Sequence, residues 1–279
     1  HVYRSDGSIQ ANTVQVDTPA HVARALLKCV EARVEAPLSR RLFEKLSEIC
    51  EGTSTHHFHP EYQLLDAGNY NEQGFEGSSD LLLDLFANAS MFCGLNAMSK
   101  LGELFGAPQR QELFKSRASL LSSGIEKNLY DPQGGFYSAA FSLKEQKTLP
   151  DAGWMILYAQ RWYPGQASAW RKAYEKLKAE TSLKWDGFEL ASGEPLSRRF
   201  MIIGKVFAQQ LGYMAQTGRS RELQDGLRFL AATVRRPENI YPEWWFHHRP
   251  KDLAGYFKGF LEENAGLWTS YLENPEGDY

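Results

Sequence analysis

Three features that would assign a chain to a common class of protein are missing from this sequence. No apolar run reaches the roughly 18 residues that a membrane span needs, because Asp84 and Asn88 interrupt the most apolar stretch. No basic stripe is present, since 31 Lys and Arg are mixed with 34 Asp and Glu for a net charge of −3. A nucleic-acid partner is therefore not expected. With 43% apolar residues the chain also lacks the composition of a disordered protein, so we expect a soluble globular fold.

Paired cysteines are missing as well. Cys29, Cys50 and Cys93 are odd in number, lie in apolar helical contexts and show no C-x-x-C spacing. We expect three buried free thiols, which favour a reducing compartment and a cytoplasmic location. The chain begins at His1 without a signal-peptide pattern, so a removed leader, with a secreted or periplasmic location, stays open as an alternative. The sequon Asn88-Ala-Ser90 lies inside an apolar helix and is expected to be a chance match.

Aromatic residues are what the sequence has in surplus. Its 13 Tyr, 16 Phe and 7 Trp exceed the need of a minimal core, and such a surplus often lines a groove. Apolar spacing predicts about nine helices, and no β-strand has to be assumed. The expected helices span residues 19–34, 39–50, 81–105, 109–128, 151–163, 168–182, 200–217, 220–234 and 252–272.

Buried and amphipathic helices alternate along the chain. The helices over 81–105 and 200–217 are apolar on nearly every side, whereas 109–128 and 220–234 each carry a polar face. Gly218 is the expected stop after 200–217. This alternation predicts one all-α domain over residues 1–279, an (α/α) toroid in which an outer ring of amphipathic helices surrounds an inner ring of buried ones.

A glycine followed by an aromatic residue recurs at similar turns. The pairs are Gly74-Phe75, Gly135-Phe136 and Gly187-Phe188, and a period of about 50 to 60 residues corresponds to one helical hairpin with its loops. Such turns serve equally well as ordinary helix caps. If the period is structural, however, these loops lie together on one rim of the toroid.

Two rim loops each place a glutamate beside aromatic residues. They are Gly74-Phe75-Glu76-Gly77, within a long connection over 51–80, and Tyr241-Pro242-Glu243-Trp244-Trp245. Cleavage of a glycosidic bond needs one carboxylic acid to protonate the leaving oxygen and one carboxylate to activate water or to attack. Aromatic packing would raise the pKa of Glu76 towards that of a usable acid. The plain alternative is that both are solvated loop carboxylates.

Two segments resemble a known family. Residues 74–106, G-F-E-G-S-S-D-L-L-L-D followed by a helix that ends in L-F-G, and residues 128–137, N-L-Y-D-P-Q-G-G-F-Y, are similar to the glucoamylase-type and related (α/α)6-barrel glycoside hydrolases. The resemblance implies an inverting glycosidase and a barrel of twelve helices; since about nine are expected here, the toroid is either shortened or lacks an N-terminal segment. It places Glu76 at the general acid, with Phe75 where the family usually has Trp. It places Glu243 near the general base, with Trp244-Trp245 in place of Tyr-Asp.

Histidines give a competing interpretation. His56, His57 and His59 lie in one expected rim loop, and His247 and His248 lie in another. The H-H-x-H spacing lacks helical i, i+4 geometry and an accompanying cysteine, so we expect no metal site and no other cofactor. The histidines are either plain surface residues or the acid/base groups of a sugar epimerase, a ketose isomerase or a polysaccharide lyase on the same fold.

Further side chains are candidates for binding a carbohydrate. Phe75, Trp154, Trp244 and Trp245 offer faces on which a sugar ring can stack, although a core role fits Trp154 equally well. Arg198 and Arg199 can hold a substrate carboxylate or pair with nearby acids. A third hypothesis is a non-catalytic helical-repeat scaffold that binds a glycan or a peptide on its aromatic rim. The sequence leaves the oligomeric state open.

Overall fold

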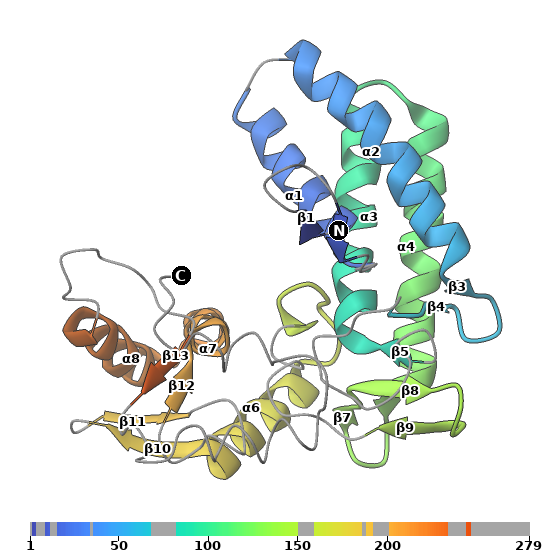
Figure 1. Ribbon diagram of the computed structural model, residues 1–279. Coiled ribbons are helices and arrows are strands. Elements are labelled where there is room, and N and C mark those ends of the chain that lie inside the picture. Colours follow the sequence, from blue (N-terminus) through green and yellow to red (C-terminus); the bar gives the residue numbers. More distant parts are fainter. Residues whose placement is uncertain are drawn as a thin grey trace.

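The computed structural model shows an arrangement of seven helices among the residues that it describes (Figure 1). Those residues are 2–3, 9–11, 16–33, 36–67, 82–149, 159–185, 188–191, 201–233 and 244–246. The helices are α1 (Thr18–Glu31), α2 (Ala36–His56), α3 (Leu85–Leu104), α4 (Pro108–Asn128), α6 (Ala167–Thr181), α7 (Gly204–Gln216) and α8 (Ser220–Thr233). None of the helices in these ranges is both long enough and apolar enough to cross a membrane.

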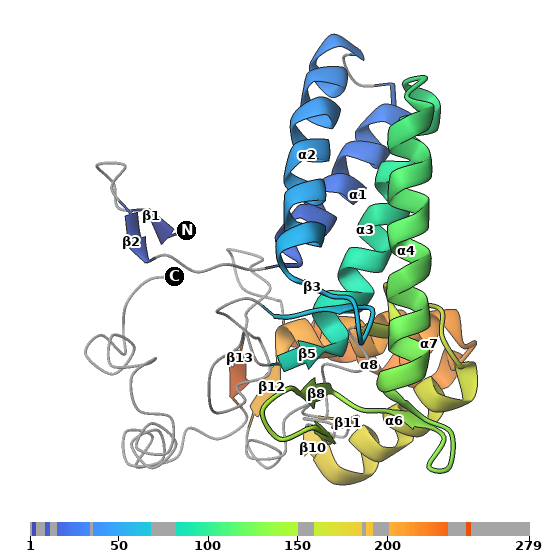
Figure 2. The same ribbon diagram turned by 90° about the vertical axis from the view of Figure 1, so that its right-hand side faces the viewer.

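Successive helices form antiparallel hairpins. Helices α1 to α4 stand side by side and alternate in direction, while α6, α7 and α8 form a second group (Figures 1 and 2). Helix α3 packs most extensively against α4 and α1. Gly94 lets α1 approach α3, because a Cβ atom there would lie 2.4 Å from the Ala20 Cα atom. These hairpins confirm the all-α fold that the sequence predicts.

The contrast between a buried helix and an amphipathic one is clearest in α3 and α4. Helix α3 is buried on most sides, and only positions such as Asn96 and Lys100 reach solvent. Helix α4 buries one face, with Phe114, Leu121 and Ile125 in the core. The structure therefore confirms the predicted order of an inner helix followed by an outer one in this hairpin.

The sequence predicts no β-strand, and that prediction was wrong. Six small sheets join residues at the ends of the helices, and each strand has two to four residues. A strand this short carries no measurable alternation of apolar and polar residues. The strands are β1 (Val2–Tyr3), β2 (Ile9–Ala11), β3 (Phe58–His59), β4 (Leu64–Leu65), β5 (Leu82–Asp84), β6 (Tyr130–Asp131), β7 (Phe136–Tyr137), β8 (Ala140–Ser142), β9 (Lys147–Leu149), β10 (Ser182–Trp185), β11 (Phe188–Ala191), β12 (Met201–Ile203) and β13 (Trp244–Phe246).

Helix α2 is longer than the sequence predicts. It continues past Cys50 to His56, through Gly52, Thr53 and Ser54, which are weak helix formers. Arg117 of α4 stabilises this end, since its guanidinium donates hydrogen bonds to the Glu51 carbonyl oxygen at 2.9 Å and to the hydroxyl groups of Ser54 and Thr55. The tertiary contact thus overrides local propensity, and the expected loop over 51–80 begins only at His57.

Several smaller expectations are also corrected or confirmed. The apolar spacing over 39–50 predicts that Leu42 and Ile49 lie on the buried face of α2, but their exposed fractions are 49% and 46%. Cys29 is exposed, so only Cys50 is a fully buried thiol; its burial raises its pKa to about 12. Gly218 has a φ of +69° just after α7, which confirms the expected helix stop. The expected helix over 252–272, and 151–158 of the helix expected over 151–163, lie outside the described residues.

Candidate functional site

Two backbone pairings lie at the N-terminal ends of helices α3 and α7. Strand β12 leads directly into α7, and its last residue, Ile203, pairs with Trp244 of β13. Strand β5 leads directly into α3, and its first residue, Leu82, accepts a hydrogen bond from the backbone N–H of Ala67 at 2.9 Å. Ala67 and Leu82, the residues on either side of the segment over 68–81, are therefore hydrogen-bonded to each other beside the start of α3.

Most predicted site residues lie outside the part of the chain that the structure describes. These are Phe75, Glu76, Trp154, Arg198, Arg199, Glu243 and His248. Trp244 and Trp245 are described, and they pair with Ile203 and Ile202 in the ladder at the start of α7. Of the predicted site residues, only His57 therefore has a described side-chain environment.

His57 and His59 share one carboxylate that the sequence analysis missed. The Nδ1 atom of His57 lies 2.8 Å from Asp66 Oδ1, and the Nε2 atom of His59 lies 3.0 Å from Asp66 Oδ2. The two histidines are partly exposed, whereas Asp66 is buried. Because side chains alternate along a strand, His57 and His59 face the same side of the β3–β4 hairpin, where both reach Asp66.

Asn88 holds this hairpin against α3. Phe58 and Leu65 face each other without exchanging hydrogen bonds, since the neighbouring pair is joined through the Asp66 N–H and the His57 carbonyl. The backbone groups of Leu65 therefore point away from β3. The Asn88 Oδ1 atom accepts the Leu65 N–H at 2.8 Å, and its Nδ2 atom donates to the Leu65 carbonyl at 2.8 Å.

Asp84 caps the same end of α3. Its side-chain Oδ1 atom accepts the Ala87 N–H at 2.6 Å, and its backbone pairs with Ala140 of β8. The Asn88 side chain also donates to the Asp84 carbonyl at 2.8 Å. Strand β5, the hairpin and the first turn of α3 are thus joined into one rigid unit beside the segment that carries Glu76.

Aromatic and charged side chains bring the first turns of α1 and α3 together. The His21 ring lies 5.5 Å from the Trp162 ring and 6.4 Å from the Phe86 ring, measured between centroids. The Arg24 guanidinium stacks on Trp162 at 3.5 Å, and Asp17 binds the Nε2 atom of His21 at 3.0 Å. From the sequence, Thr18 followed by Pro19 fits an N-cap, but the helix begins at Thr18 and the residue at the cap position is Asp17.

Glu126 is the acceptor of a buried tyrosine network. Its Oε1 atom accepts hydrogen bonds from the hydroxyl groups of Tyr137 at 2.6 Å and Tyr163 at 2.8 Å. Burial, followed by the hydrogen bond to Glu126, raises the pKa of Tyr137 well above its usual value. Burial raises the pKa of Tyr163 in the same direction. Both hydroxyl groups therefore stay protonated and donate to the Glu126 carboxylate, which fixes its position.

A metal centre has no support in the described residues. They contain no group of three or more His, Cys, Asp or Glu side chains placed to hold an ion. His57, His59 and Asp66 lie together, but they are not placed to hold an ion, because the two carboxylate oxygens already pair with the two imidazoles. The chemistry that this cluster offers is that of an imidazole oriented by a carboxylate.

No protein-family model and no curated protein sequence matches this chain. Among solved structures, the GH63 mannosylglycerate hydrolase from Thermus thermophilus in complex with glucose is similar, with a TM-score of 0.59 and 15% identity; the match covers 88% of this chain and 72% of that one. The rhamnosidase from Klebsiella oxytoca with rhamnose bound has a TM-score of 0.55 and 14% identity, over 82% of this chain and 40% of that one.

A third similar structure is the GH78 family rhamnosidase of Bacillus sp. GL1, with a TM-score of 0.53 and 15% identity over 77% of this chain and 22% of that one. This chain therefore spans less than half the length of either rhamnosidase. At such low identity the likeness shows the fold alone. The chain has the helical-hairpin toroid fold that these α/α-barrel glycoside hydrolases share.

Proposed function

We propose that the protein is a glycoside hydrolase in which Glu76 is the general acid and Glu243 is the general base that activates water. The pairing of Trp244 with Ile203 supports this proposal most, because Glu243 is joined by one peptide bond to a residue at the N-terminal end of α7. The hydrogen bond between Ala67 and Leu82 supports it for Glu76, since that bond closes the base of the segment over 68–81 beside α3. Both glutamates thus belong to segments that adjoin the N-terminal ends of α3 and α7 in the chain.

The fold supports a carbohydrate as the substrate. Two of the similar structures named above are described with rhamnose or glucose bound, which favours a hexose unit in this chain as well. In the proposed enzyme, Phe75, Trp154, Trp244 and Trp245 stack on sugar rings, while Arg198 and Arg199 bind polar substituents. The resemblance to the glucoamylase-type hydrolases favours inversion, which requires carboxyl groups about 6.5 to 9.5 Å apart.

Leaving-group dependence tests the two roles separately. Aryl and alkyl glycosides of glucose, mannose and rhamnose would be supplied to the wild type, Glu76→Gln and Glu243→Gln. Loss of the acid is expected to lower turnover of alkyl glycosides by about a hundredfold or more, but to affect activated aryl glycosides far less, because a good leaving group needs no proton. Loss of the base should affect both substrate types alike.

Glu61→Gln is the matched control for this test. Glu61 is an exposed glutamate in the turn of the β3–β4 hairpin. The Glu61→Gln variant should turn over each substrate at the wild-type rate. A Glu76→Gln or Glu243→Gln variant that behaves like Glu61→Gln would remove that residue from the mechanism.

The contact between His57 and Asp66 favours a second candidate, an epimerase, isomerase or lyase. Asp66 binds the Nδ1 atom of His57, which fixes the tautomer and leaves the Nε2 atom as the base. This candidate, in which His248 could supply a second group, predicts that His57→Ala abolishes activity and that deuterium from solvent enters the substrate. A non-catalytic glycan-binding scaffold instead predicts binding without turnover and tolerance of both Glu→Gln changes.

A further inference from the structure

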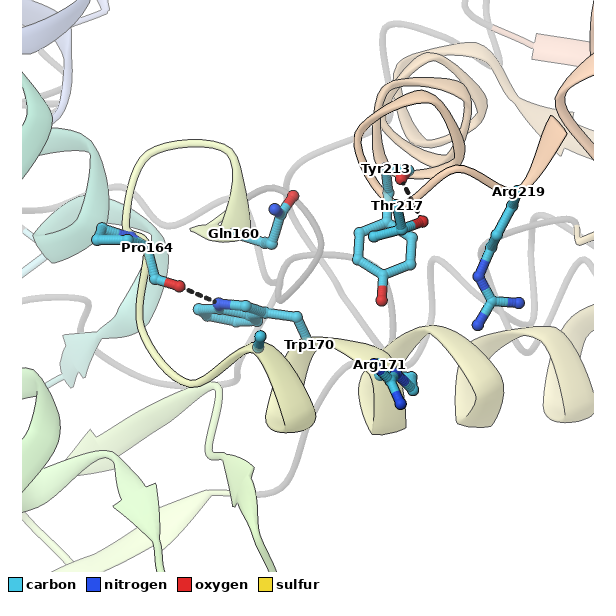
Figure 3. A pocket seen from close by; sticks show the side chains of 8 residues that line it. Gln160, Pro164, Trp170, Arg171, Tyr213, Thr217 and Arg219 are labelled. Atoms are coloured by element: carbon cyan, nitrogen blue, oxygen red, sulfur yellow. Dashed lines mark hydrogen bonds between the residues drawn. The ribbon is translucent and has the colours of Figure 1, made fainter.

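A pocket of about 460 Å³ lies between the N-terminal part of α6 and the C-terminal part of α7 (Figure 3). Its volume lies within the range of small-molecule sites. Tyr213, on its wall, is nine residues from the start of α7 at Gly204, which corresponds to about 13 Å along the helix axis. The pocket therefore lies at the opposite end of α7 from the ladder next to Glu243.

Tyr213 supplies a hydroxyl group without a partner. The residue is 3% exposed, and its ring packs on Tyr174 with centroids 4.9 Å apart. Figure 3 shows the hydroxyl directed towards α6, and within the described residues it makes no hydrogen bond. Burial raises the pKa of Tyr213 more strongly than the nearby Arg219 and Arg171 lower it, so the hydroxyl remains a donor at neutral pH. A donor of this kind is satisfied only by a ligand or by water.

Positive charge on the pocket wall is only partly neutralised. The Arg219 guanidinium binds Glu222 Oε1 at 3.0 Å and also binds Glu175, so its charge is compensated. Arg171 also lines the pocket, is exposed, and forms no ion pair with any described residue. Arg171 is therefore the guanidinium that remains available to an anion.

The helix ends at the pocket add to this potential. Ala167, the first residue of α6, lies on the wall together with Trp170 and Arg171, so the pocket lies beside the first turn of α6, near the positive end of its dipole. The carbonyl groups at the end of α7 would oppose it, but those of Tyr213, Met214 and Ala215 already accept hydrogen bonds from the turn into α8. A net preference for a negatively charged ligand follows.

We propose that this pocket is a second ligand site, separate from the proposed catalytic pair, that binds a small sugar carrying a carboxylate or phosphate group. Arg171 and the Tyr213 hydroxyl hold the anionic group. Gln160 binds a sugar hydroxyl through its Oε1 atom, because its Nε2 atom already donates to Gln216 Oε1 at 3.0 Å. The Trp170 indole forms the apolar part of the wall, with its Nε1 atom fixed to the Pro164 carbonyl at 2.8 Å.

Direct binding to the full chain tests this site without requiring turnover. D-glucuronate, D-glucose 6-phosphate, D-glucose and inorganic phosphate would be titrated by calorimetry or ligand-observed NMR. The two anionic sugars are expected to bind at least about tenfold more tightly than glucose, since a charged hydrogen bond contributes that much. Equal affinity for glucose and the anionic sugars would overturn the proposal, and so would inorganic phosphate that binds as tightly as glucose 6-phosphate.

Three variants assign the contacts. Arg171→Ala should weaken binding of both anionic sugars by about tenfold or more, and Tyr213→Phe by about twofold to tenfold. Arg221→Ala is the control, because Arg221 is an exposed arginine at the start of α8 that does not line the pocket. This substitution removes the same charge as Arg171→Ala. Arg171→Ala with the same affinity as Arg221→Ala would refute the site. Both test variants should fold, since Arg171 is exposed and Phe retains the buried ring.

Discussion

Replacing Asn88 by alanine is the substitution with the most clearly defined cost. Asn88 is fully buried, and its amide satisfies both the N–H and the C=O of Leu65. The alanine variant would leave these two backbone groups buried without partners, at about 1 to 3 kcal/mol each. The third partner of the Asn88 amide, the Asp84 carbonyl, belongs to the residue before α3, whose carbonyl accepts the first hydrogen bond of the helix. We therefore expect the free energy of unfolding to fall by about 2 to 6 kcal/mol.

Unfolding in urea, followed by circular dichroism, measures this change. Asn96→Ala is the matched control, because Asn96 lies on the same helix, is exposed and binds only the Phe92 carbonyl at 2.9 Å. The control should change the free energy of unfolding by no more than about 0.5 kcal/mol. If Asn88→Ala loses less than about 1 kcal/mol, the amide does not hold the hairpin as the geometry implies. Turnover should fall in parallel, because the hairpin ends at Ala67, beside the segment that carries Glu76.

Two further predictions concern helix packing and charge. Gly94→Ala should lower the free energy of unfolding by about 1 to 3 kcal/mol, since the new Cβ would lie 2.4 Å from the Ala20 Cα atom. Gly52→Ala should raise the free energy of unfolding by about 0.5 to 1 kcal/mol, because Gly52 lies inside α2 with open space around it. If urea unfolding shows that both glycine substitutions change stability in the same direction, these two predictions are contradicted. Burial raises the pKa of the Glu222 carboxyl, but three hydrogen bonds from neighbouring side chains outweigh it and hold the pKa below 4.5. Glu222→Gln should therefore be less stable than the wild type at neutral pH, and the difference should shrink as the pH falls below 4.5; a difference independent of pH would refute this assignment.

The helices were predictable because burial leaves a periodic signal. Leu85, Leu95 and Leu101 lie on different faces of α3, and a stretch that is apolar on all sides is typical of an inner helix. The end of α2 was not predictable, because the contact that extends it comes from Arg117, which is 62 residues away from Thr55 in the sequence. The short strands were not predicted for a different reason: strands of this length are too short to show an alternation of apolar and polar residues.

The candidate site was predictable only in part. Glycine and aromatic residues around Glu76 and Glu243 marked two loops, and the ladders at α3 and α7 show where the described chain meets them. Asp66 was missed because an isolated acid after two leucines has no distinctive spacing. The pocket could not be found in the sequence at all, since its walls come from residues as distant as Gln160 and Arg219.

The central claim, hydrolysis by two rim carboxylates, is tested most directly by turnover of an alkyl glycoside in Glu243→Gln compared with Glu61→Gln. Both variants exchange one glutamate for its neutral isostere, so circular dichroism and urea unfolding can establish that each is folded. The account predicts that Glu243→Gln loses about a hundredfold or more in turnover while Glu61→Gln matches the wild type. Equal turnover in the two variants would contradict it.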